Sequence, residues 1–260
     1  MVIMVMIVMI IFIFIFIYIK NPIQEYFINN AENKIIFINS NELYNILKND
    51  NDNYYKIFSN YDLHARKIKN IDEYIHNNIK LSVTDFTINE KKKIITCVKK
   101  ADDILKDVNL EWFNGKNAIN ISWNFGCIQG KMYENGLPHT RNNIIIISSE
   151  DINNFSENKL INTLIHEKTH IYQKIYPLDI KKYIEKHKFT KFKIRDKNDN
   201  IRANPDLDNW IYKDLSNNIY QASYNKNPSS IEDINYFPIN NQLYEHPYEK
   251  MAIEIENYNL

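Results

Sequence analysis

The sequence contains little glycine and almost no cysteine. Only 4 residues of 260 are Gly and 2 are Cys, whereas ordinary glycine usage of ~7 % would give about 18. Two cysteines cannot build the disulfide framework of a small secreted domain, although Cys97 and Cys127 leave one bridge possible. An apolar core must therefore stabilise the fold.

The chain also has no excess charge of either sign, with 32 Lys+Arg and 32 Asp+Glu. Because a neutral chain has no overall field to attract phosphate groups, we expect no nucleic-acid partner. Hydrophobic residues make up 44 % and charged residues 25 %. This is ordinary globular composition, and it excludes a largely disordered chain.

The first 19 residues contain no charged side chain, and Tyr18 is their one polar residue. At ~1.5 Å per residue such a helix spans roughly 28 Å, close to the ~30 Å hydrocarbon core of a bilayer. The pattern predicts an uncleaved transmembrane helix and a single-pass membrane protein with an N-terminal anchor. Lys20 alone does not fix its orientation. A cleaved signal peptide and a buried strand are the alternatives, but the basic n-region and small-residue cleavage site of a signal peptide are missing.

The rest of the chain divides by composition. Residues 20–60 are polar and Asn-rich and predict a stalk or a small N-terminal unit, and residues 61–260 predict the main domain. Hydrophobic periodicity there indicates both helices and strands. The helices are expected at 61–79, 87–108, from Ser156 to just before Pro177, at 179–187 and at 248–258, and the strands at 118–125 and 142–149, with a loop at 133–141.

The four glycines all fall in one short window. They are Gly115, Gly126, Gly130 and Gly136. In a chain so poor in glycine, this clustering indicates a stretch that needs backbone freedom.

One motif carries chemistry, and it lies in the helix that Ser156 begins. His166 and His170 are one turn apart on the same face, so both imidazoles can bind one metal ion. Glu167 can reach a metal-bound water without being a ligand. This is the H-E-x-x-H arrangement of zinc peptidases. Lys168 occupies a position that normally avoids charge, and we expect it to face solvent.

Zinc needs a third protein ligand besides a water. The extended form of the motif is excluded, because Gln173 and Tyr176 stand where it needs Gly and His. Three options stay open: a downstream glutamate, an aspartate in the 204–208 turn, and an upstream cysteine. The residues concerned are Glu249 and Glu245, Asp206 and Asp208, and Cys127.

Over residues 87–258 the chain resembles the zincin superfamily of metallopeptidases. Besides the H-E-x-x-H helix, Glu249-Lys-Met-Ala252 is similar to the Glu-x-x-Ala segment that carries the third ligand in many zincins. The resemblance implies an α+β domain with a mixed sheet, an active-site helix and Zn²⁺ on His166, His170 and Glu249. It also implies an edge strand beside the metal, for which 142–149 and the loop before it are the candidates. The activity implied is that of a hydrolase, a metalloprotease acting on a peptide or protein.

Peptide hydrolysis also needs a base and a donor to the oxyanion. Glu167 is the expected base. His139 and Arg141 are the expected donors because their loop is one of the few turn-rich segments, and Tyr212, Tyr244, His246 and Tyr248 are further candidates. Glu254 or Glu256 could accept a ligand histidine's second N–H. The alternative function is a catalytically inactive zincin-fold binding protein at a cell or virion surface.

Overall fold

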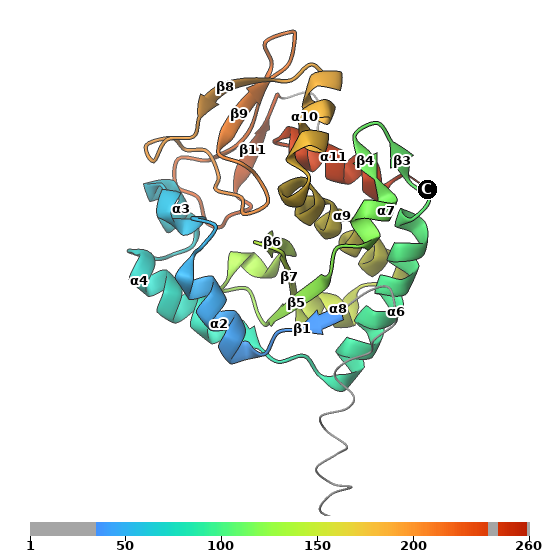
Figure 1. Cartoon of the computed structure of the whole chain (residues 1–260). Coiled ribbons are helices and arrows are strands. Elements are labelled where there is room, and N and C mark those ends of the chain that lie inside the picture. Colours follow the sequence, from blue (N-terminus) through green and yellow to red (C-terminus); the bar gives the residue numbers. More distant parts are fainter. Residues whose placement is uncertain (1–34, 239–243, 259–260) are drawn as a thin grey trace, which may run out of the picture.

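The computed structural model describes residues 35–238 and 244–258 (Figure 1). Its centre is a mixed sheet of strand order β1-β5-β7-β6, in which β1 and β7 run parallel to β5 on either side. β6 pairs antiparallel with β7 at one edge, and β2 pairs antiparallel with the end of β5. The strands are β1 (Ile35–Phe37), β2 (Val83–Thr84), β5 (Trp123–Ile128), β6 (His139–Arg141) and β7 (Ile144–Ser148).

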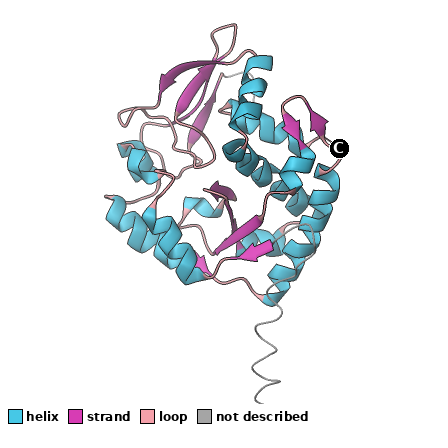
Figure 2. Ribbon diagram, in the orientation of Figure 1, coloured by secondary structure: helices cyan, strands magenta, loops and turns pink. Residues whose placement is uncertain are grey.

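Helices cover both faces of this sheet (Figure 2). All five residues of β7 are buried, as the continuous apolar run predicts for a strand covered on both faces. Ile145 and Ile147 pack in the core that includes α6 and α9, whereas Ile144 and Ile146 pack in a second core that includes α2 and η2. The covering helices are α2 (Ser40–Asn49), η2 (Tyr74–Ile79), α6 (Ile88–Leu105), α8 (Ser149–Asn154), α9 (Glu157–Ile175) and α11 (Pro247–Glu256).

A second, antiparallel sheet of order β11-β10-β9-β8 follows α9 and α10 in the chain. Its strands are β8 (Thr190–Ile194), β9 (Trp210–Lys213), β10 (Ile219–Tyr224) and β11 (Ile234–Phe237). The other elements are η1 (Tyr55–Ile57), α3 (Asn60–Ala65), α4 (Ile71–Glu73), α5 (Lys80–Ser82), the hairpin β3 (Asn109–Leu110) and β4 (Phe113–Asn114), α7 (Gly115–Ile119), η3 (Glu134–Gly136) and α10 (Pro177–Lys186).

Local signals place most helices correctly. Thr87 caps α6 in a reciprocal capping box with Glu90, and Pro247 occupies the first turn of α11. The helix expected at 61–79 is wrong as one unit, because Lys67 adopts a left-handed φ of 56° and the chain restarts at the cap Asn70. The strand expected at 118–125 begins only at Trp123, since the Asn114 side chain caps the short helix α7.

Of the two candidates for the edge strand, the structure favours the loop before 142–149. β7, which covers most of 142–149, lies between β5 and β6 and is not at an edge. Three residues of the preceding segment, expected as a loop, form strand β6 at the edge beside β7. Gly136 permits this path: its φ is +77°, and a Cβ there would lie 2.8 Å from the Gly130 carbonyl oxygen.

The predicted fold class needs one correction. It combined an α+β zincin-like domain and mixed sheet with an N-terminal transmembrane helix. The structure is α+β with a mixed sheet, but within residues 35–238 and 244–258 no helix has the length and apolarity to cross a membrane. The predicted span, 1–19, lies outside the described residues.

Part of the segment expected to be a stalk or small unit, 20–60, belongs to the central sheet. Ile35–Phe37 is strand β1, and Asn39 caps helix α2 by accepting from the backbone N–H of Glu42. Leu43 and Leu47 of α2 are fully buried against the sheet. The fold therefore includes residues from Ile35 onward.

Candidate metal centre

Helix α9 holds the H-E-x-x-H motif against the central sheet. Ser156 begins it by accepting a hydrogen bond from the backbone N–H of Lys159, and Pro177 opens the next helix. Leu160 and Leu164 are fully buried among the core residues of the sheet. The same apolar face that anchors the helix thereby sets the direction of His166.

Lys168, expected at the surface, is fully buried. Its Nζ donates to the Ile121 carbonyl at 2.5 Å and lies 4.0 Å from the centre of the Trp123 ring. Burial lowers the pKa of its ammonium to about 7, against the opposing charge of Asp102. A carbonyl and an aromatic face thus accommodate a charge at a position where the motif usually has none.

Helix α11 brings Glu249 to the two histidines. The His246 side chain caps this helix by accepting from the Tyr248 N–H, so Glu249 falls in the first turn. Ala252, one turn later, is fully buried where α11 packs against α9. The small side chain lets the two helices approach closely, as the Glu-x-x-Ala spacing predicts.

The three expected ligand atoms meet at one point. His166 Nε2 lies 3.1 Å from His170 Nε2 and 3.3 Å from Glu249 Oε2, and His170 Nε2 lies 3.7 Å from Glu249 Oε2. Ligand atoms at ~2.1 Å from a tetrahedral zinc ion would be about 3.4 Å apart. The spacing therefore fits zinc. In the described ranges these residues are the one group of three or more His, Cys, Asp or Glu that converges this way.

The other ring nitrogens are held by acceptors. His166 Nδ1 lies 3.1 Å from Glu256 Oε2, and His170 Nδ1 lies 3.1 Å from Gln173 Oε1. The Gln173 amide nitrogen donates to the Tyr248 carbonyl, which leaves its oxygen facing His170. Each Nδ1 therefore donates a proton to its acceptor, and both Nε2 atoms face the Glu249 carboxylate. Three acceptors facing one another require a proton or a metal cation between them.

The pKa shifts of these residues also indicate that a cation or a proton must lie between them. Burial alone would lower the pKa of His166, but Glu249 and Glu256 raise it well above its usual value. Burial lowers the pKa of His170. Although burial acts to raise the pKa of Glu249, the two histidines hold it below its usual range, so the carboxylate stays ionised.

Glu167 lies beside this cluster and is only 4 % exposed. Burial, and next the charge of Asp206, raise the pKa of Glu167 well above its ordinary value. Its Oε2 atom has no hydrogen-bond partner among the residues that the structure describes. A buried carboxylate oxygen without a partner is costly, and such atoms are a feature of sites that act on a bound molecule.

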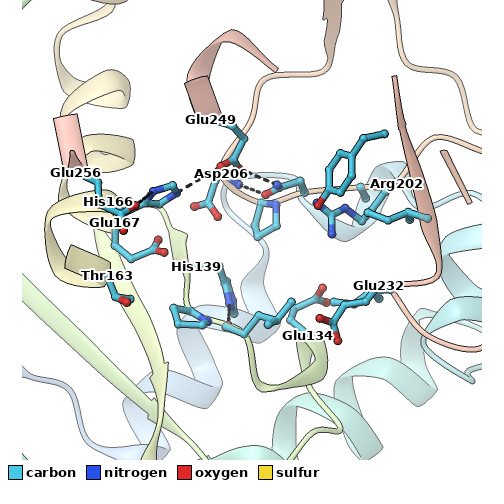
Figure 3. Close-up of a pocket in the computed structure, with 18 of the residues that line it drawn as sticks. Glu134, His139, Thr163, His166, Glu167, Arg202, Asp206, Glu232, Glu249 and Glu256 are labelled. Atoms are coloured by element: carbon cyan, nitrogen blue, oxygen red, sulfur yellow. Dashed lines mark hydrogen bonds and ion pairs between the residues drawn. The ribbon is translucent and has the colours of Figure 1, made fainter. Parts of the chain in front are cut away.

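The cluster opens into a cavity of about 700 Å³ (Figure 3). His166, Glu167 and Glu249 line it together with residues of β11 and of the segment before β9, and Asn204 of that segment donates to Glu249 Oε1 at 3.0 Å. The edge strand β6 contributes His139. The cavity is thus bounded by the candidate metal-binding residues, by the edge of the central sheet and by strand β11 of the second sheet.

His139 lines this cavity, but both of its nitrogens are engaged. Nδ1 donates to the Leu137 carbonyl at 2.8 Å, and Nε2 faces the Tyr133 hydroxyl at 3.2 Å. Burial lowers the pKa of His139, which favours the neutral ring. In this form Nε2 accepts from Tyr133, so no ring N–H is left to donate to an oxyanion.

Arg141 does not line the cavity. Its guanidinium is buried and paired with Asp50 at 2.8 Å and with Asp52 at 2.6 Å. It also donates to the Tyr133 hydroxyl, the group that faces His139. These contacts tie β6 to the segment after α2, which is a structural arrangement.

The alternative third ligands lie elsewhere. Asp206 borders the cavity, and its Oδ1 accepts from the Thr140 N–H at 2.7 Å and from the Thr140 hydroxyl. Glu245 binds Arg202 and the Asn204 amide. Cys127 is buried in β5, where burial raises its pKa to about 12. None of the three belongs to the converging group.

Three of the remaining candidates for the oxyanion donor, Tyr212, His246 and Tyr248, gather around Asp208 near the start of α11. Asp208 accepts hydrogen bonds from the hydroxyls of Tyr212 and Tyr248 and lies 3.2 Å from His246 Nε2. The ring of Tyr244 stacks on that of Tyr220. Of the two acids expected behind a ligand, Glu256 contacts His166, whereas Glu254 lies near His187.

Several polar residues of the cavity were not predicted from the sequence, and two of them, Arg202 and Tyr236, can donate hydrogen bonds. Arg202 and Tyr236 line the cavity together with His166, Glu167 and Glu249. Arg202 pairs with Glu245, yet its buried Nε atom has no partner within the described part of the chain. Neither residue lies in a recognisable motif, so no signal in the sequence could have found them.

Three comparisons with known proteins identify no relative: no family model, no curated protein and no solved structure matches the chain. The class of protein must therefore be argued from the geometry of the site.

Proposed function

We propose that the protein is a zinc-dependent peptidase. The observation that carries this proposal is the convergence of His166, His170 and Glu249 beside the unpartnered Oε2 of Glu167. Two imidazoles and one carboxylate are the donor set of catalytic zinc sites, which keep a fourth position for water or substrate. Glu256 and Gln173 would orient the two ligand histidines.

A zinc ion held by these three residues would polarise a scissile carbonyl and acidify a water. Glu167 Oε2 accepts the proton of the attacking water as the new C–O bond forms. The same oxygen then delivers that proton to the leaving nitrogen as the C–N bond breaks, so Glu167 ends the cycle unchanged. Arg202 and Tyr236, which line the same cavity, are the donors that we assign to the substrate carbonyl.

The test measures zinc content and peptide cleavage for the full chain and for Glu167→Gln. We expect equimolar zinc in both proteins and a cleavage rate reduced about 10²–10⁴-fold in the variant. Glu157→Gln is the matched control, because Glu157 lies on the same helix but pairs with Lys100 at the surface.

Absence of zinc in the wild-type protein would overturn the proposal. Undiminished cleavage by Glu167→Gln would remove Glu167 from the mechanism. Bound zinc without any cleavage would favour the alternative, a binding protein that has this site without turnover.

A further inference from the structure

A second cavity of about 550 Å³ adjoins the first. It lies between the end of α3, the helix η2, and the loops around 131–135 and 229–231. Glu134 and Ile231 line both cavities. The two cavities are therefore neighbours that share one wall, and a polypeptide that reaches from the first to the second must cross Glu134 and Ile231.

The shared wall presents no free carboxylate to such a chain. The Glu134 carboxylate receives Arg66 Nε at 2.9 Å, Arg66 Nη2 at 2.7 Å and the hydroxyls of Tyr54 and Tyr74. Nearby, the Glu232 carboxylate accepts from the Asn135 amide. The charge of Glu134 is thus balanced by Arg66, whereas the exposed Glu232 carboxylate keeps its negative charge.

The backbone around the second cavity is held in an uncommon conformation. Three of its lining residues, Lys67, Glu134 and Asn135, have positive φ values of 56°, 45° and 56°. Residues other than Gly, and Lys and Glu in particular, rarely adopt this conformation, and such outliers concentrate at functional sites.

The free charge of the second cavity is positive. Lys67 and Lys131 are exposed, and within the described residues neither ammonium forms a hydrogen bond or an ion pair. The opposing charge on the lining is Glu73, whose carboxylate accepts the Lys69 backbone N–H at 2.7 Å. Lys131 also interacts electrostatically with Asp151, which does not line the cavity. In the first cavity the acids outnumber the bases, because Glu167, Asp206, Glu249 and Glu256 line it together with Lys159 and Arg202.

We propose that the second cavity is a substrate subsite for an acidic side chain, set several residues from the scissile bond, and that Lys67 and Lys131 determine this specificity. The inference rests on the proposed peptidase function. It defines the substrate as an extended polypeptide with an acidic residue on one side of the cleavage point.

The experiment measures binding and cleavage separately. Labelled peptides that are identical except for Asp, Asn or Lys at one position, scanned outward from the centre, are titrated against zinc-loaded Glu167→Gln by fluorescence anisotropy. The same peptides are then cleaved by the wild-type enzyme. Both measurements are repeated on proteins that also carry the double substitution Lys67→Gln/Lys131→Gln. The control is the double substitution Lys69→Gln/Lys80→Gln, which removes the same charge at two lysines that do not line the cavity.

We expect one position at which the Asp peptide binds about fivefold to tenfold more tightly than the Asn peptide, the effect of two exposed cations. The preference should disappear in Lys67→Gln/Lys131→Gln, persist in the control, and weaken with added salt. An unchanged preference in Lys67→Gln/Lys131→Gln, a preference for Asp at no position, or no peptide binding would overturn the inference. Binding with the expected preference but without wild-type cleavage would instead refute the peptidase function.

Discussion

Glu134→Gln is the substitution whose effect on stability can be worked out most fully. The side chain of Glu134 is 4 % exposed, and it pairs with Arg66, which is 2 % exposed. Burial alone would raise the pKa of Glu134, but Arg66 overrides it and lowers the pKa from 4.5 to about 2. The neutral amide removes the charge, keeps the shape, and takes from the buried Arg66 guanidinium one of its two carboxylate partners, the other being Asp62 at 3.4 Å.

The size of the stability change follows from the pKa shift of Glu134. A change from 4.5 to about 2, at ~1.36 kcal/mol per pH unit, contributes about 3 kcal/mol to the free energy of unfolding. Because the folded-state pKa is the lower one, this contribution is complete above about pH 4.5 and is lost as the pH falls towards 2. About 2 kcal/mol of it is gone by pH 3. At pH 7 the variant should lose about 3 kcal/mol, since this contribution is absent while Asp62 still pairs with Arg66.

Urea unfolding of both proteins at pH 7, 5, 4 and 3, with chelator present throughout, measures this difference. The difference in the free energy of unfolding between wild type and Glu134→Gln should fall by about 2 kcal/mol between pH 5 and pH 3. Glu111→Gln, at a side chain that is 72 % exposed, should show no such change. A gap between wild type and Glu134→Gln that stays constant within about 0.5 kcal/mol over this range would refute the reasoning.

Three further outcomes are expected. Glu256→Ala should weaken zinc binding about 10–100-fold in a competition titration, because His166 loses its acceptor, whereas Glu254→Ala should not. Leu164→Ala should cost about 2–5 kcal/mol in urea unfolding, since the side chain is fully buried against the sheet; a smaller cost would mean that the site collapses. Ser156→Ala should cost about 1 kcal/mol through loss of the α9 cap, and Ser156→Gly should restore part of it.

The sequence predicted the features that local rules govern. Caps such as Thr87 and Ser156, the proline that opens α11, and the continuous apolar run of β7 each depend on a few neighbouring residues. Their positions could therefore be read along the chain. The spacing of His166 and His170 is a local rule of the same kind, because one helical turn sets it.

Features that depend on long-range pairing could not be predicted in this way. Three residues of a turn-rich loop became the edge strand β6 because β7 offered them a free edge to pair with. Lys168 is buried because strand β5 places Trp123 beneath it. Arg141 lies in the expected segment, but its side chain pairs with Asp50 and Asp52, far back in the chain.

The sequence by itself determined that two imidazoles and an adjacent carboxylate would project from one helix. Only the tertiary structure decided that Glu249 completes the set, since that requires α11 to pack on α9 over Ala252. It also decided which acids border the cavity and which are neutralised, because Glu134 meets Arg66 only in the folded chain. A helix fixes its own faces through backbone hydrogen bonds, whereas the partner of each face depends on how the whole chain buries its apolar surface.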